Sequence, residues 1–396
     1  MRPVPLTRPA PGFSLIELMV SILIGMIALI FATRMVTGTD EARQSALGGS
    51  DQMQNGMLAM FSISNDAAQA GWGLNDPLLV GCDTVMSDTG HYALPEVARG
   101  TGTVHPLAAA IIENNGTRPD RITLLAGSSM SGTGTMRIIA NYSTGTRIDV
   151  DRVPYGFNQG DVIVAAPETA GAAQCALAQI SNDTSALAPP PADQYVNIAS
   201  GTSFRFNSGA LGAAYSGSQA RLFNLGPAGG LAFHTWSVAN GLLQLRSTDL
   251  AGASAAPSTV VDNVVSIKAQ YGFDTRLGAA FQPQTGLTVQ RWSNTMIDAD
   301  GDTVVGSAGD YQHVAALRIA VVARSRAPEK PAADGTCSAT STKPHIFATD
   351  APDGVTAVPV DVDVDVTGDT LSWKCYRYRV FETIVPLRNA AWRPTA

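Results

Sequence analysis

The sequence predicts an α+β protein in which a long N-terminal helix packs on an antiparallel β-sheet head domain enlarged by insertions. Three observations favour this fold. An apolar stretch over residues 13–31 contains a single charge, Glu17. Helical spacing of apolar residues continues beyond it to about Ala70. From residue 72 onward, short apolar segments of strand length alternate with Gly, Asn, Asp, Pro and Ser.

The composition suits an exported protein with a sizeable core. Of the 396 residues, 45% are hydrophobic and only 15% are charged, and 38 are glycine. Such a mixture is typical of secreted or surface β-rich proteins rather than of cytosolic enzymes. The formal charge of −7 and the absence of a Lys- or Arg-rich run argue against nucleic acid as the main ligand.

The apolar stretch is long enough to cross a hydrocarbon core of ~30 Å as a helix. The leader before it, residues 1–12, contains Arg2 and Arg8 and no acidic residue, which predicts a cytoplasmic N-terminus and an exported remainder. The residues that follow the stretch, FATRMVTG, match a small-x-small cleavage site poorly. We therefore expect the helix to stay on the mature protein.

Glu17 is the unusual residue of this stretch. An acidic side chain costs ~2.5–3.5 kcal/mol at the centre of a membrane helix, and less near an interface. A carboxylate in such a place usually has a partner and a function. The alternative is a tolerated Glu17 that snorkels to the headgroups.

The helical pattern continues after the apolar stretch. We expect one helix over residues 13–70, with a weak point near Gly48 and a stop at Gly71. A stripe of mostly apolar residues at helical spacing is expected to pack on the head domain rather than to bind a ligand. Its members are Met53, Met57, Met60, Phe61 and Ser64.

Eight later segments have the length and the β-branched or aromatic content of strands. They are residues 121–127, 161–167, 175–181, 229–238, 241–247, 264–273, 313–325 and 377–387. None is followed by a long amphipathic helix, so an antiparallel sheet packed on the exported half of the helix is expected. Residues 187–194 and 327–335 are rich in Pro, Ala and Asp or Gly and are expected to be loops.

Four cysteines show no C-x-x-C or Cys/His cluster, which makes zinc improbable. They are Cys82, Cys175, Cys337 and Cys375. An even number in an exported chain predicts two disulfides, for which three pairings exist. We expect the sequential pairing, Cys82–Cys175 and Cys337–Cys375, because each bond then closes one module. The alternative is four buried free thiols.

Two acidic patterns are candidate sites. Asp298, Asp300 and Asp302 alternate in a Gly-containing turn, as the first ligands of a Ca²⁺ loop do. Thr303 and Gly309 stand where an EF-hand needs Gly and Glu, so the alternative is a solvated turn. Apart from this Ca²⁺, no cofactor is expected.

The second acidic pattern is the run PVDVDVDVTGD over residues 359–369. Its period of two predicts a strand with an apolar face and an acidic face, the latter made by Asp361, Asp363 and Asp365. We expect an edge strand whose charges discourage pairing with foreign strands. Docking of a basic partner subunit is the alternative.

No enzymatic motif is present, so the protein is predicted not to be an enzyme. The chain lacks a G-x-S-x-G elbow, a P-loop, H-E-x-x-H and G-x-G-x-x-G. Its five histidines show no ligand spacing; they are His91, His105, His234, His313 and His345. A Ser/His/Asp triad assembled only in space is the alternative.

The segment PGFSLIELMVSILIG resembles the class III signal of type IV prepilins, which has a basic leader, a Gly before the cut, Phe as first mature residue and Glu as the fifth. The resemblance implies that prepilin peptidase cleaves the bond between Gly12 and Phe13 and that Phe13 is then N-methylated. It also implies that Glu17 neutralises the α-amino group of Phe13 in a neighbouring subunit during assembly.

Later segments resemble the minor pilins of the PilW family. The matching segments are GC at 81–82 and residues 160–175, 260–275, 317–326 and 376–389. This resemblance implies a type IV pilin-like fold and a minor pilin that primes filament assembly at or near the tip. Its partners would be prepilin peptidase, other minor pilins, the major pilin and the inner-membrane assembly platform, with no nucleic acid.

The same resemblance predicts the domain organisation and the location. Residues 1–12 would be the leader, 13–70 the membrane-spanning and assembly helix, and 71–396 the exported head, with a boundary near 187–194 and a disulfide-closed module over 327–396. The protein would lie in the inner membrane of a Gram-negative-type bacterium with its head in the periplasm, and then in the pilus at the cell surface.

Two rival functions use the same kind of signal. One is a minor pseudopilin of a type II secretion system, which co-purification with one assembly or the other distinguishes. The second is a membrane-tethered adhesin or enzyme with a prepilin-like signal. A ligand-binding or hydrolase screen of the head tests this alternative.

Overall fold

The computed structural model describes residues 12, 14–129, 134–184 and 193–391, without the side chains of residues 37–48, 390 and 391. Two compact units make up the chain, residues 1–51 and 52–396. Helix α1 (Leu15–Gln69) contributes to both and is continuous at Gly48, where the sequence predicted a weak point. It is followed by Gly71, whose φ of +84° ends the helical backbone and whose N–H donates to the Leu125 carbonyl at 2.8 Å.

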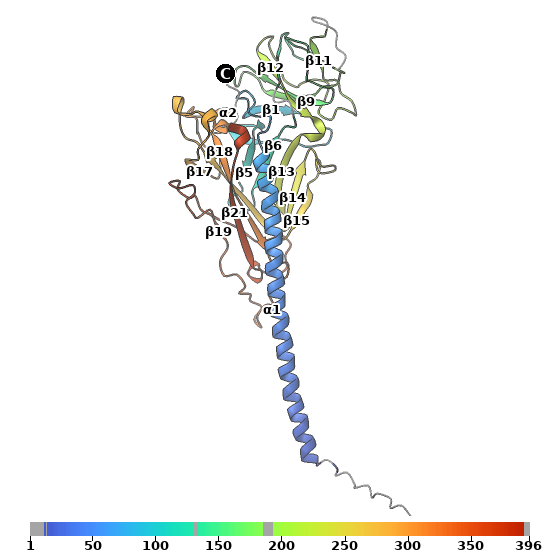
Figure 1. The fold of residues 1–396 in the computed structure, drawn as a ribbon, viewed down its shortest axis with the longest axis vertical. Coiled ribbons are helices and arrows are strands. Elements are labelled where there is room, and N and C mark those ends of the chain that lie inside the picture. The colour runs from blue at the N-terminus through green and yellow to red at the C-terminus, as the bar shows by residue number, and fades with distance from the viewer. Residues whose placement is uncertain (1–11, 13, 130–133, 185–192, 392–396) are drawn as a thin grey trace, which may run out of the picture. The chain divides into compact units, whose positions relative to one another are not determined.

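The second unit is a β-rich head built on three main sheets (Figure 1). The five-stranded sheet has the order β15 (Ser258–Asp262), β14 (Leu242–Ser247), β13 (Ala232–Ala239), β6 (Arg121–Ala126) and β5 (Ala110–Glu113). The four-stranded sheet has the order β17 (Arg291–Ser293), β16 (Val264–Phe273), β18 (Val314–Arg324) and β21 (Tyr378–Pro386). Both sheets are antiparallel throughout.

The third sheet has six strands and mixed direction. Its order is β4 (Pro106–Leu107), β1 (Cys82–Met86), β10 (Cys175–Gln179), β9 (Asp161–Pro167), β12 (Ala220–Pro227) and β7 (Thr135–Ile138). Strands β1 and β10 run parallel, so the prediction of a purely antiparallel head is wrong at this pair. Parallel neighbouring strands need a long connection, and here the connection is the segment between residues 86 and 175.

The remaining elements are short. Three two-stranded ribbons pair β2 (Val97–Arg99) with β3 (Gly102–Val104), β8 (Arg147–Asp149) with β11 (Tyr195–Asn197), and β19 (His345–Ile346) with β20 (Val360–Asp361). The short helices are α2 (Ala308–Gln312), α3 (Arg388–Ala391), η1 (Ala228–Gly230), η2 (Gly278–Ala280), η3 (Pro283–Thr285) and η4 (Trp373–Cys375).

All eight segments predicted as strands form strands, namely β6, β9, β10, β13, β14, β16, β18 and β21. The predicted loop over 327–335 contains no helix or strand. The other predicted loop, 187–194, lies outside the described residues apart from its last two.

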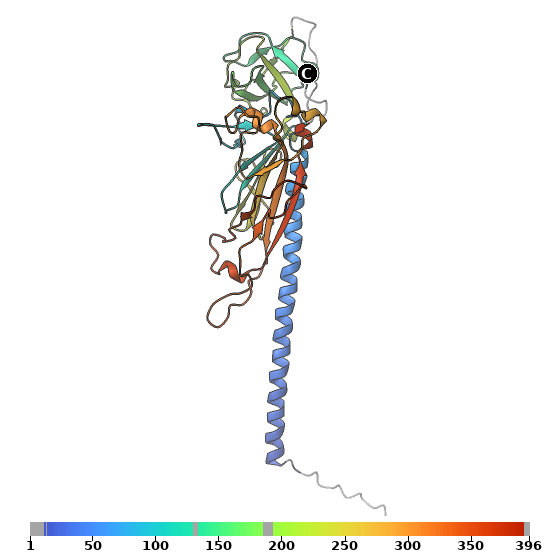
Figure 2. The same ribbon diagram turned by 90° about the vertical axis from the view of Figure 1, so that its left-hand side faces the viewer.

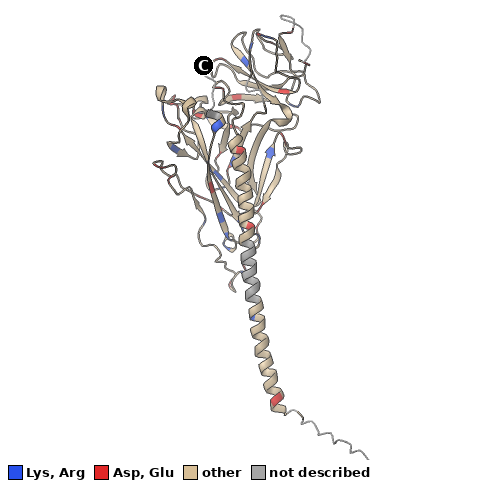
Figure 3. Cartoon of the chain, in the orientation of Figure 1, with Lys and Arg blue, Asp and Glu red and all other residues tan. Residues whose placement is uncertain are grey.

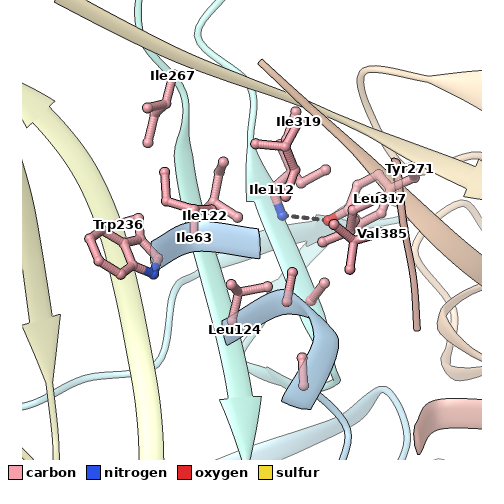
Figure 4. Packing of buried hydrophobic residues seen from close by; sticks show 14 of the residues in the cluster. Ile63, Ile112, Ile122, Leu124, Trp236, Ile267, Tyr271, Leu317, Ile319 and Val385 are labelled. Atoms are coloured by element: carbon pink, nitrogen blue, oxygen red, sulfur yellow. Dashed lines mark hydrogen bonds between the residues drawn. The ribbon is translucent and has the colours of Figure 1, made fainter. Parts of the chain in front are cut away.

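The head packs on the C-terminal part of α1, residues 52–69. Figures 1 and 2 show this part of the helix along one side of the four-stranded and five-stranded sheets. Ile63 of α1 enters a shared core with Ile122 and Trp236 of the five-stranded sheet and with Ile319 of β18 (Figure 4). Within this core the Tyr271 hydroxyl accepts a hydrogen bond from the backbone N–H of Ile112 at 2.5 Å. The predicted packing of helix on sheet is therefore confirmed.

The helix face that packs on the head differs from the predicted one. Met53, Met57 and Phe61 are exposed, and Met60 is partly buried against the core. The buried stripe consists of Gln52, Gly56, Ala59, Ile63, Ala67 and Ala70. A Cβ at Gly56 would lie 2.0 Å from the Phe381 ring, so β21 approaches the helix too closely for a large side chain. Gly56, Ala59 and Ala67 face the sheet together with Ile63, whereas Met53, Met57 and Phe61 face outward.

Candidate assembly surface

The N-terminal part of α1 exposes its apolar side chains. The segment Leu15–Val36 is 22 residues long, has a mean hydropathy of 2.6 and is not buried at any position. Its charged residues are Glu17 and Arg34, and the rest of it is tan in Figure 3. A helix of this length spans about 33 Å, enough for a bilayer core. Among the described residues, one helix is long and apolar enough to cross a membrane, and it is this one.

Glu17 lies in the first turn of this helix. Its carboxylate accepts a hydrogen bond from the backbone N–H of Ser14 at 3.3 Å, and Ser21 Oγ donates to its carbonyl at 2.7 Å. A carboxylate here satisfies a helix-end donor and interacts favourably with the helix dipole. Glu17 thus caps its own helix within one chain.

The predicted processing site is only partly described. Gly12 is exposed, whereas Phe13 and the leader residues 1–11 lie outside the described residues. Cleavage between Gly12 and Phe13, methylation of Phe13 and pairing of Glu17 with a neighbour's amino group therefore stay predictions.

A second apolar surface, which we call the outer helix stripe, lies on α1 within the head unit. It consists of Met53, Met57, Leu58 and Phe61, whose exposed fractions are 39%, 56%, 48% and 68%. Sequence reasoning found three of these residues but assigned them to the wrong side of the helix. The signal that separates the two faces is residue size, because Gly56, Ala59 and Ala67 mark the face that a sheet can approach closely.

A charged cluster holds the same helix on the five-stranded sheet. His234 of β13 lies 2.8 Å from Asp66 of α1 through Nδ1 and 2.8 Å from Asp249 through Nε2. Trp236 Nε1 donates to the same Asp66 carboxylate at 2.8 Å. Burial by itself lowers the pKa of His234, but the hydrogen bonds to Asp249 and Asp66 outweigh it and raise the pKa to about 9. His234 is therefore an imidazolium between two carboxylates at neutral pH.

This cluster makes the stability of the head depend on pH. Because the folded-state pKa of His234 lies above the unfolded value of about 6.5, its contribution is complete below pH 6.5 and is lost as the pH rises through 9. We expect the free energy of unfolding to fall by on the order of 2–3 kcal/mol across this window. Urea unfolding of the full-length chain in detergent measures it. His234→Gln should remove this fall, and a fall that persists in the variant contradicts the assignment; His345→Gln, at an exposed pair with Asp361, is the control.

Both expected disulfides are present. Cys82 bonds to Cys175, which lies 93 residues later, and Cys337 bonds to Cys375, 38 residues later. The sequential pairing is confirmed. The first bond links the parallel strands β1 and β10, and the second closes the loop that leads into β21.

The acidic turn brings its three carboxylates together. Ligand oxygens of Asp298, Asp300 and Asp302 lie within 4.8 Å of one another. Each also accepts a backbone N–H, from Gly301 and Thr303 for Asp298, from Asp302 for Asp300 and from Val304 for Asp302. Thr303 has a φ of +72°, at the position where an EF-hand carries glycine. Oxygen ligands at this separation fit Ca²⁺, while the backbone hydrogen bonds give the turn a structural role without a metal.

Calcium binding at this turn stays a prediction. We expect millimolar Ca²⁺ to raise the melting temperature of the wild-type chain by a few degrees, because a ligand that binds only the folded state stabilises it. The variant D298N/D302N loses two charges and keeps one acceptor oxygen at each position, so residue 298 can accept one backbone N–H instead of two. Its melting temperature should not respond to Ca²⁺. A wild-type melting temperature unchanged by millimolar Ca²⁺ ends the prediction.

The alternating acidic run is paired within the chain. Val362 and Val364 are buried, as the period of two predicts. Strand β20 is only Val360–Asp361, so the predicted long edge strand is wrong in extent. Lys343 Nζ contacts Asp363 at 2.6 Å and Asp365 at 2.7 Å, and His345 contacts Asp361 at 2.8 Å. These internal partners weaken the case for a basic docking subunit.

The histidines form no catalytic constellation in the part of the chain that the structure describes. His234 and His345 contact carboxylates. Backbone carbonyls lie near Nδ1 of His105 and His313, those of Pro95 and Asp274. Among the described residues, none of these four rings has a serine hydroxyl as a hydrogen-bond partner, and His91 has a φ of +65°.

An exposed apolar helix followed by a disulfide-bonded β head agrees with the fold that the sequence resemblance implies. Two family models match parts of the chain. The prokaryotic N-terminal methylation motif matches residues 8–33, and type IV pilus-assembly protein W, the PilW family, matches residues 235–389. These matches support a PilW-family, prepilin-like protein. The assignment suggests a structural, non-enzymatic role.

Comparison with solved structures and with curated sequences adds little. The type IV-like pilin TTHA1219 from Thermus thermophilus aligns with 14% identity and a TM-score of 0.20, covering 40% of this chain and 66% of that one. The chain thus spans just under two thirds of the length of that pilin. Comparison with curated proteins gives no significant match.

Proposed function

We propose that the protein is a minor pilin of a type IV pilus that primes filament assembly together with other minor pilins. The observation that carries the proposal is the exposed apolar surface of one helix, which has two parts, Leu15–Val36 and the outer helix stripe. The head exposes other large apolar residues as well, Tyr155 and Leu277 among them, but these two parts of α1 are apolar over two turns or more. Apolar surface of this kind requires lipid or other helices around it. A membrane holds the first part before assembly, and the helices of neighbouring pilins cover both parts afterwards.

Prepilin peptidase would cleave between Gly12 and Phe13 and thereby create the charged amino group of Phe13 next to the apolar helix. Glu17, which caps its own helix in one chain, would then exchange the Ser14 amide for the amino group of a neighbour. Two opposite charges that are each costly in an apolar bundle become tolerable when they pair. The partners follow from this scheme: prepilin peptidase, other minor pilins, the major pilin and the inner-membrane assembly platform.

A position at or near the tip is supported by size. The head unit covers residues 52–396, and its added strands enlarge it well beyond what one sheet on a helix requires. Such a head is bulky for a subunit that repeats along a shaft and fits better where neighbours are few. The head would lie in the periplasm before assembly and at the cell surface afterwards.

The outer helix stripe provides the test. Replacing Phe61 by Asp should reduce pilus number at least tenfold and abolish co-purification with other pilins, because a charge would enter a helix interface. The fold should remain intact, since 68% of the Phe61 side chain is exposed. Pilus counts by electron microscopy and cross-linking in membranes measure the effect.

Tyr155→Asp is the matched control, because Tyr155 is an exposed aromatic residue of the head that does not lie on α1. It should leave pilus number unchanged. Wild-type assembly in Phe61→Asp contradicts the proposal. If the wild-type chain co-purifies with secretion pseudopilins rather than with pilins, its helix packs in a type II secretion system instead of a pilus.

A further inference from the structure

Three sites in the sequence have the N-x-S/T pattern of an N-glycosylation acceptor. They are Asn115-Gly116-Thr117, Asn141-Tyr142-Ser143 and Asn182-Asp183-Thr184. The pattern alone is common by chance, so accessibility has to distinguish them. An acceptor needs an asparagine amide and a hydroxyl that are both exposed and not already engaged.

The structure excludes two of the three sites. The Asn182 Nδ2 atom is buried, and the Thr184 hydroxyl is buried and donates to the Phe157 carbonyl at 2.5 Å. In the second site, Asn141 Oδ1 accepts the Gly217 N–H at 2.8 Å. The middle residue of that site, Tyr142, is buried and pairs with Tyr215 through two backbone hydrogen bonds of 2.8 and 2.7 Å.

The first site lies on the loop between β5 and β6, where Asn115, Gly116 and Thr117 are all exposed. Among the described residues, no hydrogen bond involves the Asn115 amide side chain or the Thr117 hydroxyl. This site therefore meets both requirements of an acceptor.

Hydrogen bonds fix the backbone of this loop, while the side chains of residues 115 and 117 are exposed. The buried Lys268 ammonium donates to the carbonyls of Gly116 and Arg118 at 2.8 and 3.1 Å. Asn114 Oδ1 accepts the Gly116 N–H at 2.9 Å, and Gly116 takes a φ of +63° to make the turn. Anchoring through carbonyls leaves the Asn115 amide and the Thr117 hydroxyl exposed on the same turn.

We propose that Asn115 is an N-glycosylation site that accepts an oligosaccharide activated as a lipid-linked pyrophosphate. The Asn115 Nδ2 atom attacks C1 of the first sugar, an N–C1 bond forms, and the C1–O bond to the pyrophosphate breaks. One amide proton is released and the lipid pyrophosphate leaves with the bonding electrons, so no oxidant or reductant is needed. The site requires export of the head, which is part of the proposed function, but it does not require filament assembly.

The test is mass spectrometry of the full-length chain purified from membranes of its own cells, both intact and as proteolytic peptides. We expect the peptide that contains Asn115 to carry an added mass in sugar increments. Asn115→Gln and Thr117→Ala should remove that mass, whereas Thr117→Ser, which keeps the hydroxyl, should retain it. Asn141→Gln is the matched control and should also retain it. Because residues 115 and 117 are exposed, these variants should fold.

A wild-type peptide without added mass overturns the proposal, and so does added mass that persists in Asn115→Gln. The same intact-mass spectrum reports the N-terminus. An unmodified Asn115 on a chain that begins at Phe13 overturns glycosylation alone, whereas a glycan on an unprocessed chain overturns prepilin processing alone.

Discussion

Replacing Lys268 by Met is expected to lower the free energy of unfolding by about 3–5 kcal/mol, the usual cost of breaking a buried ion pair on one side. The Lys268 side chain is 1% exposed and its ammonium contacts the carboxylate of Asp120, which is fully buried. Burial raises the pKa of Asp120 even with Lys268 beside it. Without the cation, the carboxylate is buried without a counter-charge, and two loop carbonyls lose their donor.

Lys343→Met is the matched control, because Lys343 also bridges carboxylates but at the surface. Its loss should cost no more than about 1 kcal/mol. The cost of Lys268→Met should shrink as the pH falls, because burial raises the pKa of Asp120 and the carboxyl then becomes neutral in the folded state. Urea unfolding of the full-length chain in detergent, followed by tryptophan fluorescence, compares the two variants. Equal costs contradict a structural role for the buried pair.

Removing the Cys82–Cys175 disulfide by alanine at both positions should lower the free energy of unfolding by about 4–5 kcal/mol, on the chain-entropy model for a loop of this length. The two cysteines are 93 residues apart, and the strands that they join are parallel. Parallel strands cannot be joined by a tight turn, so the disulfide is the short covalent link between β1 and β10. Amide hydrogen exchange should rise first in β1 and β10.

The Cys337–Cys375 bond is the internal comparison. Because its cysteines are only 38 residues apart, removal of this bond should lower the free energy of unfolding by about 0.8 kcal/mol less than removal of the Cys82–Cys175 bond. Hydrogen exchange should then rise around β21 and leave β1 and β10 protected. A larger loss of unfolding free energy on removal of the Cys337–Cys375 bond than of the Cys82–Cys175 bond contradicts the chain-entropy model.

The sequence was sufficient for local structure and for residues that act alone. The helix over 15–69 and eight strands follow from periodicity and β-branched content, and the presence of two disulfides follows from the even number of cysteines. The sequential pairing is expected because each bond then closes one module. The apolar span and Glu17 are visible because a charge in an apolar run is rare. In the PilW-like region 235–389, the predicted strand β18 pairs with β16 on one side and with β21 on the other.

Features that depend on distant residues were not predictable. Both faces of α1 carry apolar residues, so periodicity could not tell that Ala59 and Ile63 pack inward while Met57 and Phe61 face outward. The pairs Lys268–Asp120 and His234–Asp66 join residues 148 and 168 positions apart. No local pattern marks such pairs, and the division of the strands into three sheets is set by the same long-range contacts.

The central claim is that a prepilin-type signal delivers this helix and head to a pilus. The most direct measurement is the intact mass of the wild-type chain from membranes, recorded without reductant and again after reduction and alkylation. The account predicts a polypeptide that begins at methylated Phe13, with four cysteines that react only after reduction. A polypeptide that begins at Met1, or one that is cut beyond residue 33, contradicts it, because either result removes the amino group that Glu17 is proposed to pair with.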